Sequence, residues 1–475
     1  MKVLFCTSES IPFAASGGLA DVSSALPKSL NELDVDCRVV MPLYEGISNE
    51  FKNKMKYITN FFVPVSWRQQ YCGVFMLEHD GVIYYFLDNE YYFKRNNLYG
   101  YDDDAERFTF FSRAVLEMIS HIDYKPDIIH SNDWQTALIP VYYSLIYVHY
   151  NWYYGIKNIF TIHNIQYQGK YGLEIIDNVV GIPAEKISIM EFDNCANFMK
   201  GAIESADIVT TVSPTYAKEI LSPWFSYGLD SILKDRSFKV CGILNGIDDK
   251  EYNPQTDNLI YENYSFSDIQ GKFKNKQLLR NRLFLEQKDV PLIGMVTRLV
   301  EQKGIDLVVN ALEALLNEED VQFVILGSGQ YEYEKFFFDM QNKYKGRVCA
   351  CYGFVPELSH KIYAASDLFL MPSKTEPCGL SQMIALRYCS IPIVRETGGL
   401  FDSVKDSGDE IGNGFTFKNY QKDDMLYAIK RAVWGYKNKE GFNILRKRAM
   451  KCDNSFKKSA KKYLDIYNTI NNHIK

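Results

Sequence analysis

Short apolar runs alternate along the chain with segments whose apolar residues recur at helical spacing. Phe108, Phe111, Val115, Met118 and Ile119 have such spacing and predict a helix that covers a sheet. The apolar runs of the first half predict strands at 2–7, 37–41, 127–130, 158–163, 208–212 and 240–244. Strands that alternate with helices are typical of a parallel sheet in an α/β domain.

The pattern pauses over 248–274, a polar stretch that we expect to link two domains. A second series of strands follows, at 292–297, 322–326, 348–352, 368–372 and 391–395. Two parallel sheets joined by a linker predict two doubly wound domains that face a cleft. Because such sheets bind ligands outside the carboxyl ends of their strands, we expect the chemistry in the turns that follow the strands.

Composition narrows the possible partners. The chain has 475 residues, of which 47% are hydrophobic and 24% charged, as in an ordinary globular protein. Its formal net charge of −6 gives no electrostatic reason to expect a nucleic-acid or anionic-membrane partner. Without an apolar run of 18 residues or a signal-like N-terminus, we expect a cytoplasmic protein.

The ten cysteines and seven histidines are scattered, and no Cys-x-x-Cys motif occurs. We therefore expect free thiols and no structural zinc site. Cys349 and Cys351 are the closest pair, and we expect the alternation of side chains along a strand to keep them apart. Only His130 and His163 lie near predicted strand ends, without a carboxylate pair beside them, so we expect no catalytic metal. The absence of a Gly-x-Ser-x-Gly motif argues against a serine hydrolase.

Two glycine turns follow strands and open helices. Gly17 and Gly18 form the first, and Thr397, Gly398 and Gly399 form the second. Either turn alone is ordinary structure, but together they could bind the two ends of a diphosphate-linked group, since a helix N-terminus attracts anions. Gly327 begins a third such turn, which we interpret as mostly structural and keep as a candidate donor contact.

Charged residues follow other strands. Arg298 and Lys303 are either a surface pair or cations that neutralise a departing diphosphate. Glu376 either caps the helix that follows it or pairs with a sugar hydroxyl or a developing cationic carbon. Two polar pairs, Asp133–Trp134 and His163–Asn164, occupy corresponding strand ends of the first domain.

Eight motifs, in this order, resemble those of bacterial glycogen synthases and plant starch synthases. They are Gly-Gly-Leu-Ala-Asp-Val, Asn-Asp-Trp, Thr-Ile-His-Asn-Ile-Gln-Tyr-Gln-Gly, Thr-Thr-Val-Ser-Pro-Thr-Tyr-Ala, Leu-Asn-Gly-Ile-Asp, Arg-Leu-Val-Glu-Gln-Lys-Gly, Glu-Pro-Cys-Gly-Leu and Thr-Gly-Gly-Leu. The resemblance covers about residues 2–467.

This resemblance implies a GT-B glycosyltransferase with two Rossmann-like domains. The first, on the acceptor side, is expected at 1–247, with a C-terminal helix at 455–475 that crosses back to it. The second, at 248–454, is expected to bind the nucleotide sugar. The implied reaction transfers glucose from a nucleotide sugar, ADP-glucose above others, to the non-reducing 4-OH of an α-1,4-glucan with retention of configuration, and needs no metal or other cofactor.

The resemblance also implies roles for individual residues. Arg298 and Lys303 would stabilise the leaving diphosphate, while Glu376 and His163 would lie beside the donor glucose. Further donor contacts would come from Gly17, Gly18, Asn245, Gly327, Phe354 (against the base), Cys378, Gly379, Leu380, Thr397, Gly398 and Gly399. The sugar or acceptor side would be bordered by Asp21, Asp133 and Asn164.

One departure from the family bears on the donor. Most bacterial members have a lysine two residues before the paired glycines, where this chain has Ala15. A glycosyltransferase that uses UDP-glucose or another acceptor therefore stays open, as does a catalytically weak glucan-binding protein. A plastid location of a mature chain is the alternative to the cytoplasm. Because no nucleophile is evident for a double displacement, we expect a front-face substitution.

Overall fold

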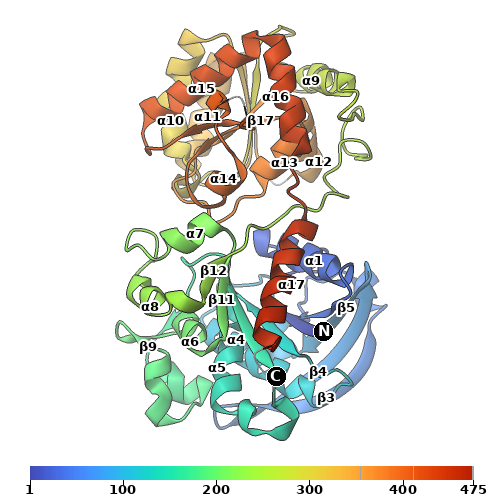
Figure 1. Ribbon diagram of the computed structural model, residues 1–475, viewed down its shortest axis with the longest axis vertical. Helices are drawn as coiled ribbons and strands as arrows, with labels where there is room; N and C mark the ends of the chain where they lie inside the picture. The colour runs from blue at the N-terminus through green and yellow to red at the C-terminus, as the bar shows by residue number, and fades with distance from the viewer. Residues whose placement is uncertain (354, 410, 473–475) are drawn as a thin grey trace. The chain divides into compact units, whose positions relative to one another are not determined.

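The computed structural model describes residues 1–353, 355–409 and 411–472 (Figure 1). The chain forms two compact units. The first comprises Met1–Asn245 and Phe456–Lys475, and the second Gly246–Ser455. The first unit is therefore discontinuous in sequence.

A nine-stranded sheet forms the centre of the first unit, in the order β12-β11-β7-β6-β1-β2-β5-β4-β3. Its strands are β1 (Lys2–Cys6), β2 (Asp36–Pro42), β3 (Lys56–Val65), β4 (Arg68–His79), β5 (Val82–Asp88), β6 (Ile128–Asn132), β7 (Lys157–Ile162), β11 (Ile208–Thr211) and β12 (Val240–Gly242). Neighbouring strands are parallel except for the antiparallel β3–β4 and β4–β5 pairs. In the centre, Val3 of β1 pairs with Cys37 of β2 and Ile128 of β6, which brings the carboxyl ends of these strands to one edge.

Helices pack on this sheet, and a small second sheet extends the unit. The helices are α1 (Gly18–Asn31), α2 (Asn49–Lys52), α3 (Glu90–Phe93), α4 (Asp104–Ile119), α5 (Leu138–Leu145), α6 (Phe198–Ser205), α7 (Pro214–Glu219), α8 (Asp230–Asp235) and α17 (Phe456–Asn472). The small sheet has the order β8-β10-β9, with β8 at Lys170–Tyr171, β9 at Glu191–Phe192 and β10 at Cys195–Asn197. The predicted helix around Phe108 is α4.

The last helix, α17, completes the first unit. It lies beside α1 (Figure 1) and buries Phe456, Tyr463 and Tyr467. The Tyr467 hydroxyl lies 2.7 Å from Nδ1 of His130, which is fully buried in β6. The crossing of the C-terminal helix back to the first domain, which the resemblance implied, is thus confirmed.

The second unit contains a six-stranded, fully parallel sheet in the order β15-β14-β13-β16-β17-β18. Its strands are β13 (Leu292–Val296), β14 (Gln322–Leu326), β15 (Val348–Cys351), β16 (Leu368–Met371), β17 (Ile391–Arg395) and β18 (Phe415–Phe417). Its helices are α9 (Gln270–Arg282), α10 (Ile305–Glu318), α11 (Tyr331–Lys343), α12 (Pro356–Ala365), α13 (Ser381–Arg387), α14 (Gly398–Ser403), α15 (Lys422–Lys437) and α16 (Lys439–Lys451).

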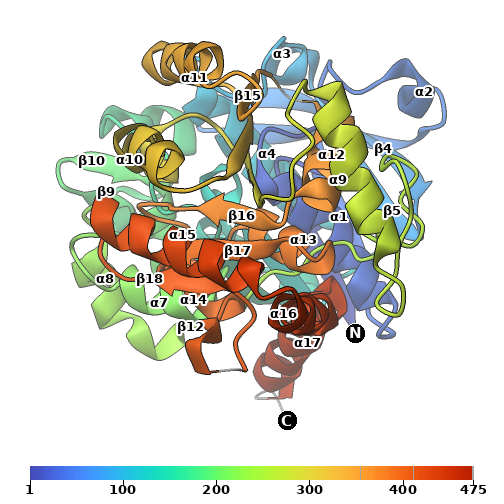
Figure 2. The same cartoon turned by 90° about the horizontal axis from the view of Figure 1, so that it is seen from above.

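Helices cover both faces of this sheet. Figure 2 shows α10 and α15 on one side of β16 and β17, and α9 and α12 on the other. Alternate residues such as Ile293 and Met295 of β13 point to the first face, where they join a core with α10 and α15. Because both faces are covered, these strands are continuously apolar, which is why the sequence pattern reveals them.

The segment at 248–269, which was expected to link the two domains, is docked onto the second unit. The buried Asp257 carboxylate accepts a hydrogen bond from the Tyr388 hydroxyl at 2.5 Å and lies 2.8 Å from Nδ1 of His360. The Tyr264 hydroxyl donates to the Tyr388 carbonyl at 2.8 Å. The polar residues that suggested a loose loop instead satisfy buried partners, and α9 already begins at Gln270.

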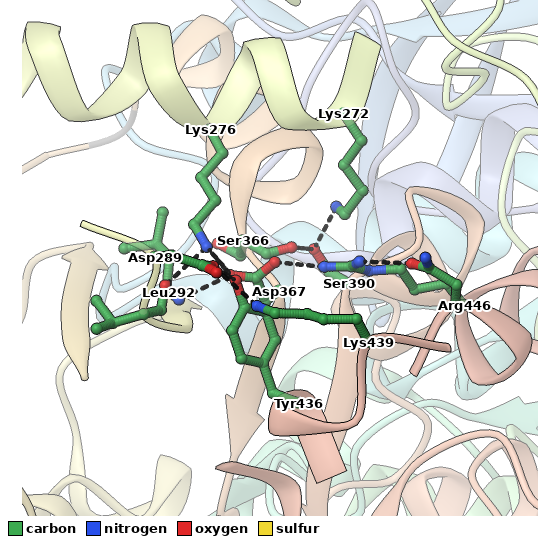
Figure 3. A network of polar contacts seen from close by, with 12 residues as sticks. Lys272, Lys276, Asp289, Leu292, Ser366, Asp367, Ser390, Tyr436, Lys439 and Arg446 are labelled. Carbon is green, nitrogen blue, oxygen red and sulfur yellow. Dashed lines mark hydrogen bonds and ion pairs between the residues drawn. The ribbon is translucent and has the colours of Figure 1, made fainter. Parts of the chain in front are cut away.

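A buried charged network lies where the central strands β13 and β16 begin (Figure 3). The carboxylate of Asp367, whose side chain is 2% exposed, lies 2.5 Å from Lys276 of α9 and 2.5 Å from Arg446 of α16. It also accepts a hydrogen bond from the Leu292 amide at 2.9 Å. Because Asp367 precedes β16 and Leu292 begins β13, this one carboxylate ties two helices to the starts of two central strands.

A second buried lysine of α9 extends this network. The Lys272 ammonium donates to the carbonyls of Ala364 at 3.1 Å and Tyr388 at 2.7 Å, at the C-terminal ends of α12 and α13. Burial lowers the pKa of Lys272 to about 7. The partial negative charge of the two helix ends favours an ammonium group there.

The expectation that the strand separates Cys349 and Cys351 is wrong. Successive side chains alternate between the faces of a strand, so residues two apart point to the same face. Both cysteines belong to β15, and their Sγ atoms are 3.8 Å apart.

Candidate active site

Two loops meet at the carboxyl ends of β13 and β16. The Lys303 ammonium lies 2.7 Å from Oε2 and 2.9 Å from Oε1 of Glu376, and the Ser373 hydroxyl donates to Oε2 at 2.9 Å. Glu376 is 5% exposed, so its charge is compensated within a largely dry environment. The resemblance implied that Lys303 contacts the leaving diphosphate and that Glu376 lies beside the donor glucose. In the structure the two side chains pair with each other.

Backbone contacts fasten these two loops. The Lys374 amide donates to the Gln302 carbonyl at 2.9 Å. Gly304 follows Lys303 with a φ of +73°, and a Cβ there would lie 2.2 Å from the carbonyl oxygen of Pro372. A side chain at 304 would therefore separate the loops, so this glycine is what lets Lys303 reach Glu376.

Arg298 lies at the same edge but has a different environment. Its side chain is exposed and makes no hydrogen bond or ion pair with any residue that the structure describes. The Leu299 amide beside it donates to the Ser328 carbonyl at 2.9 Å, and the Gly327 amide donates to the Cys351 carbonyl at 3.0 Å. The turn that begins at Gly327 therefore supports the segment that carries Arg298.

The second glycine turn packs directly on the Glu376 loop. The Gly399 amide donates to the carbonyls of Glu376 at 3.1 Å and Pro377 at 3.2 Å, and a Cβ at 399 would lie 2.2 Å from the Cys378 carbonyl oxygen. The structure thus brings Gly398 and Gly399 to the Glu376 loop. In this structure the Gly399 amide donates to these carbonyls.

The remaining donor candidates of this unit surround the same loop. Cys378 is buried, and the Gln382 side chain donates to the carbonyls of Cys378 at 3.1 Å and Gly379 at 2.8 Å. Leu380 immediately precedes α13, and the buried Thr397 immediately precedes α14. Phe354 lies outside the described residues.

A second cluster occupies the ends of β6 and β7 in the first unit. Oδ1 of Asp133 accepts hydrogen bonds from the amides of His163 at 2.7 Å and Asn164 at 3.3 Å. Burial raises the pKa of Asp133 to about 7, although these hydrogen bonds oppose the shift. The structure therefore brings Asp133, His163 and Asn164 together.

The hydrogen bonds of Asn132 determine the tautomer of His163. The side-chain nitrogen Nδ2 of Asn132 donates to the carbonyls of Cys6 at 3.0 Å and His130 at 3.2 Å. These bonds direct the side-chain oxygen Oδ1 of Asn132 to Nε2 of His163, 2.9 Å away. Burial lowers the pKa of His163 to about 3, so the ring is neutral at physiological pH. Nε2 then carries the proton, and Nδ1 is a hydrogen-bond acceptor.

The first glycine turn is anchored by a residue that the sequence did not suggest. The buried Glu9 carboxylate accepts hydrogen bonds from the amides of Ser16 at 2.5 Å and Gly17 at 3.3 Å. A Cβ at Gly17 or Gly18 would meet no atom within 4 Å, so the backbone stays accessible. Because the Gly17 amide is occupied, the amides available to an anion begin with Gly18, in the first turn of α1.

Two further candidates belong to the first unit. Asp21 lies in the first turn of α1 and is half-buried. Asn245 is 5% exposed, and its Oδ1 has no hydrogen-bond partner among the residues described. A buried acceptor of this kind is costly unless a ligand or water satisfies it.

The residues that sequence reasoning missed are Glu9, Asn132 and Ser373. Asn132 ends β6, while Glu9 and Ser373 lie in the segments that follow the carboxyl ends of β1 and β16, and these positions were the available signal. Within the described part of the chain, no helix is both long and apolar enough to span a membrane, and no three His, Cys, Asp or Glu side chains are grouped as metal ligands.

An Asn at position 133 offers a test of the Asp133 environment. A carboxyl whose pKa is raised from about 4 to about 7 contributes stability below pH 4 that is lost as the pH rises through 7. Asn keeps an acceptor oxygen for the two amides and tolerates the positive φ of 57°. We expect the unfolding free energy of the wild type, relative to Asp133→Asn, to fall by on the order of 2 kcal/mol between pH 4 and 7.5, after allowance for partial exposure. Urea titrations at several pH values measure this difference, and parallel pH profiles of the two proteins would contradict it.

The chain matches two protein families. Residues 2–235 match the starch synthase catalytic domain, and residues 280–444 match glycosyl transferases group 1.

Full-length relatives are similar as well. A glycogen synthase of Clostridium botulinum is 50% identical over 98% of this chain and 99% of its own, and one of Geobacillus thermodenitrificans is 50% identical over 98% and 97%. The solved catalytic domain of starch synthase IV from Arabidopsis thaliana, bound to ADP and acarbose, superposes with a TM-score of 0.91 at 35% identity, covering 99% of both chains.

Proposed function

The chain belongs to the family of bacterial glycogen synthases and plant starch synthases, and on that premise we propose which of its residues perform the reaction of that family. The protein is a retaining GT-B glycosyltransferase. It transfers glucose from a nucleotide sugar, ADP-glucose above others, to the non-reducing 4-OH of an α-1,4-glucan. The observation that carries the assignment of residues is the buried Lys303–Glu376 pair beside an exposed, unpartnered Arg298.

In this proposal Arg298 is the main ligand of the leaving diphosphate. An arginine side chain that makes no hydrogen bond with the protein can donate hydrogen bonds from its planar guanidinium group to phosphate oxygens. It then stabilises the negative charge that develops as the glycosidic bond breaks. Lys303 holds the Glu376 carboxylate and adds positive charge at the same edge. These two cations supply the charge that a metal ion would otherwise provide, so the proposal includes no metal or other cofactor.

Glu376 and His163 are proposed to contact the donor glucose. The carboxylate, fixed by Lys303 and Ser373, accepts from sugar hydroxyls and favours positive charge at the reacting carbon. His163 is neutral and offers Nδ1 as a hydrogen-bond acceptor, because its Nε2–H donates to Oδ1 of Asn132. Asp133 and Asn164 then border the sugar, and Asn245 gives its unpartnered oxygen to the donor.

The retained configuration is proposed to arise by front-face substitution. A double displacement needs a nucleophile on the face opposite the leaving group, and the proposed donor contacts include no second carboxylate for that role. The departing phosphate instead accepts the proton of the acceptor 4-OH as that oxygen bonds to the anomeric carbon. The remaining residues of the proposed site, around Gly18, Cys378, Gly379, Leu380 and Thr397, hold the donor.

The partners in this proposal are a nucleotide sugar and an α-1,4-glucan, without nucleic acid or membrane. The bound ADP and acarbose of the Arabidopsis thaliana enzyme support a nucleotide and an oligosaccharide as ligand classes. We place the enzyme in the cytoplasm, with the bacterial relatives as support.

A radiolabel transfer assay tests the function and the consequence of Ala15. Purified protein is incubated with glycogen and ADP-[14C]glucose or UDP-[14C]glucose, and label in precipitated polysaccharide is counted. We expect incorporation from ADP-glucose to exceed that from UDP-glucose. Greater incorporation from UDP-glucose would mean that a different donor is used without the family lysine. Incorporation from neither, with glycogen still bound in a sedimentation assay, would favour a glucan-binding protein.

A further inference from the structure

Cys349 and Cys351 form a pair of neighbouring thiols on an edge strand. β15 is the first strand of the six-stranded sheet and pairs with β14 alone. The two Sγ atoms are 3.8 Å apart on the same face, and both residues are partly exposed. The pair is therefore accessible to a small reagent.

The local electrostatics favour one thiolate in this pair. The pKa of the Cys351 thiol is lowered by its hydrogen bond with the Cys349 thiol, and the nearby Arg282 guanidinium adds to the effect. The pKa of the Cys349 thiol is raised for the same reason. Arg282 itself pairs with Glu357 at 3.1 Å in an exposed ion pair. A partly exposed thiol of lowered pKa beside a second thiol is the arrangement of a nucleophilic and a resolving cysteine.

Other cysteines lack this combination. Cys6 and Cys37 occupy the neighbouring strands β1 and β2, but both are buried, and burial raises the pKa of each thiol. Cys241 is partly exposed, and burial raises the pKa of its thiol. It therefore provides a matched control.

We propose that Cys349 and Cys351 are a modification site, a dithiol that a hydroperoxide closes to an intrachain disulfide. The Cys351 thiolate attacks the peroxide; an S–O bond forms, the O–O bond breaks, and the alkoxide or hydroxide leaves and takes up a proton. Cys349 sulfur then attacks the resulting sulfenic acid; the S–S bond forms, the S–O bond breaks, and the leaving hydroxide takes the Cys349 proton as water. The two sulfurs together lose two electrons. These electrons reduce an organic hydroperoxide to an alcohol and water, or hydrogen peroxide to two molecules of water.

The geometry of a strand permits this closure. At about 3.3 Å of rise per residue, Cα atoms two residues apart are about 6.6 Å from each other, at the upper end of the range of about 4.4–6.8 Å seen in disulfides. A local bend of β15 brings the two Cα atoms closer and allows the disulfide between Cys349 and Cys351 to form. Because β15 is an edge strand, the strand ladder that this bend disturbs is the one with β14.

The bend would reach the candidate donor site. The Cys351 carbonyl accepts the hydrogen bond of the Gly327 amide at 3.0 Å, and the turn from Gly327 supports the Arg298 segment. Loss of that bond is expected to raise the KM for ADP-glucose about fivefold, the equivalent of about 1 kcal/mol. This consequence rests on the proposed function, whereas the thiol chemistry does not.

The test treats the intact protein with hydrogen peroxide, blocks free thiols with iodoacetamide, and analyses the peptide that contains both cysteines by mass spectrometry. We expect a peptide that has lost two hydrogen atoms, carries no alkyl label and regains both thiols with dithiothreitol. Cys349→Ser is expected to stop at the sulfenic acid on Cys351, whereas Cys241→Ser is expected to behave as the wild type. The proposal would be overturned if both cysteines were still alkylated by iodoacetamide after peroxide treatment, or if they oxidised separately to sulfinic acids.

Kinetics on the same samples test the link to the donor. The KM for ADP-glucose is expected to rise in the oxidised wild type and to stay constant in oxidised Cys349→Ser/Cys351→Ser. A disulfide that forms without a change in KM would overturn the link to the Gly327 turn. Failure of the proposed function would appear differently, as absence of transfer before any oxidation.

Discussion

Replacing Arg298 by alanine is expected to lower kcat by about 10²–10³-fold with little change in stability. The side chain is exposed and makes no hydrogen bond or ion pair with the described residues, so its removal costs the fold less than about 0.5 kcal/mol. If it binds the leaving diphosphate, its loss removes stabilisation that the transition state needs most. Arg298→Lys should recover part of the rate, since it keeps the charge and loses the bidentate geometry.

The measurement is initial-rate kinetics with ADP-glucose and glycogen, together with urea unfolding of each variant. Lys335→Ala is the matched control, because Lys335 is an exposed cation on α11 that is not assigned to the site. Lys303→Ala provides a contrast: it leaves the buried Glu376 unpaired, so both rate and stability should fall. An Arg298→Ala variant with near-normal kcat would remove Arg298 from the mechanism.

Replacing Asp367 by asparagine is expected to lower the unfolding free energy of the second unit by about 3–5 kcal/mol. Asparagine keeps the volume and an acceptor for the Leu292 amide, so the change isolates the charge. Lys276 and Arg446 would then lose the charged carboxylate that both contact directly, in a site where their side chains are 8% and 3% exposed.

Urea unfolding followed by hydrogen exchange in β13 and β16 measures this loss where it is expected. Asp289→Asn is the control from Figure 3, since the Asp289 side chain is 78% exposed and pairs with the exposed Lys439. That surface pair is expected to contribute less than about 1 kcal/mol. Equal effects of the two substitutions would mean that the buried network does not stabilise the unit through its charges.

How far the sequence predicts the fold depends on how each strand is buried. Parallel strands such as β13 and β14 are covered on both faces and read as apolar runs, so they were predicted nearly to the residue. The antiparallel strands β3 and β4 were missed because one face meets solvent: Phe62 and Tyr71 pair across the strands and are exposed. Polar residues occupy the start of each strand, Lys56–Asn60 in part and Arg68–Gln70, so only part of each strand is an apolar run.

The candidate site was predictable in position but not in its contacts. The rule that ligands bind at carboxyl ends of strands led to Lys303, Glu376, Asp133 and His163, each of which lies in the segment that follows such an end. That Lys303 would pair with Glu376 depends on Gly304 packing against the distant Pro372, which no local pattern encodes. The expectation for Cys349 and Cys351 failed for a simpler reason, a misapplied strand period.

The discontinuous first unit has a consequence for the order in which the protein is made. A ribosome completes the second unit, Gly246–Ser455, before it reaches α17. Until α17 emerges, α1 has an uncovered flank and His130 in β6 lacks the Tyr467 hydroxyl. The half of the molecule that is synthesised first is thus finished last, and a nonsense mutation just before Phe456 would leave a complete second unit attached to an unfinished first one.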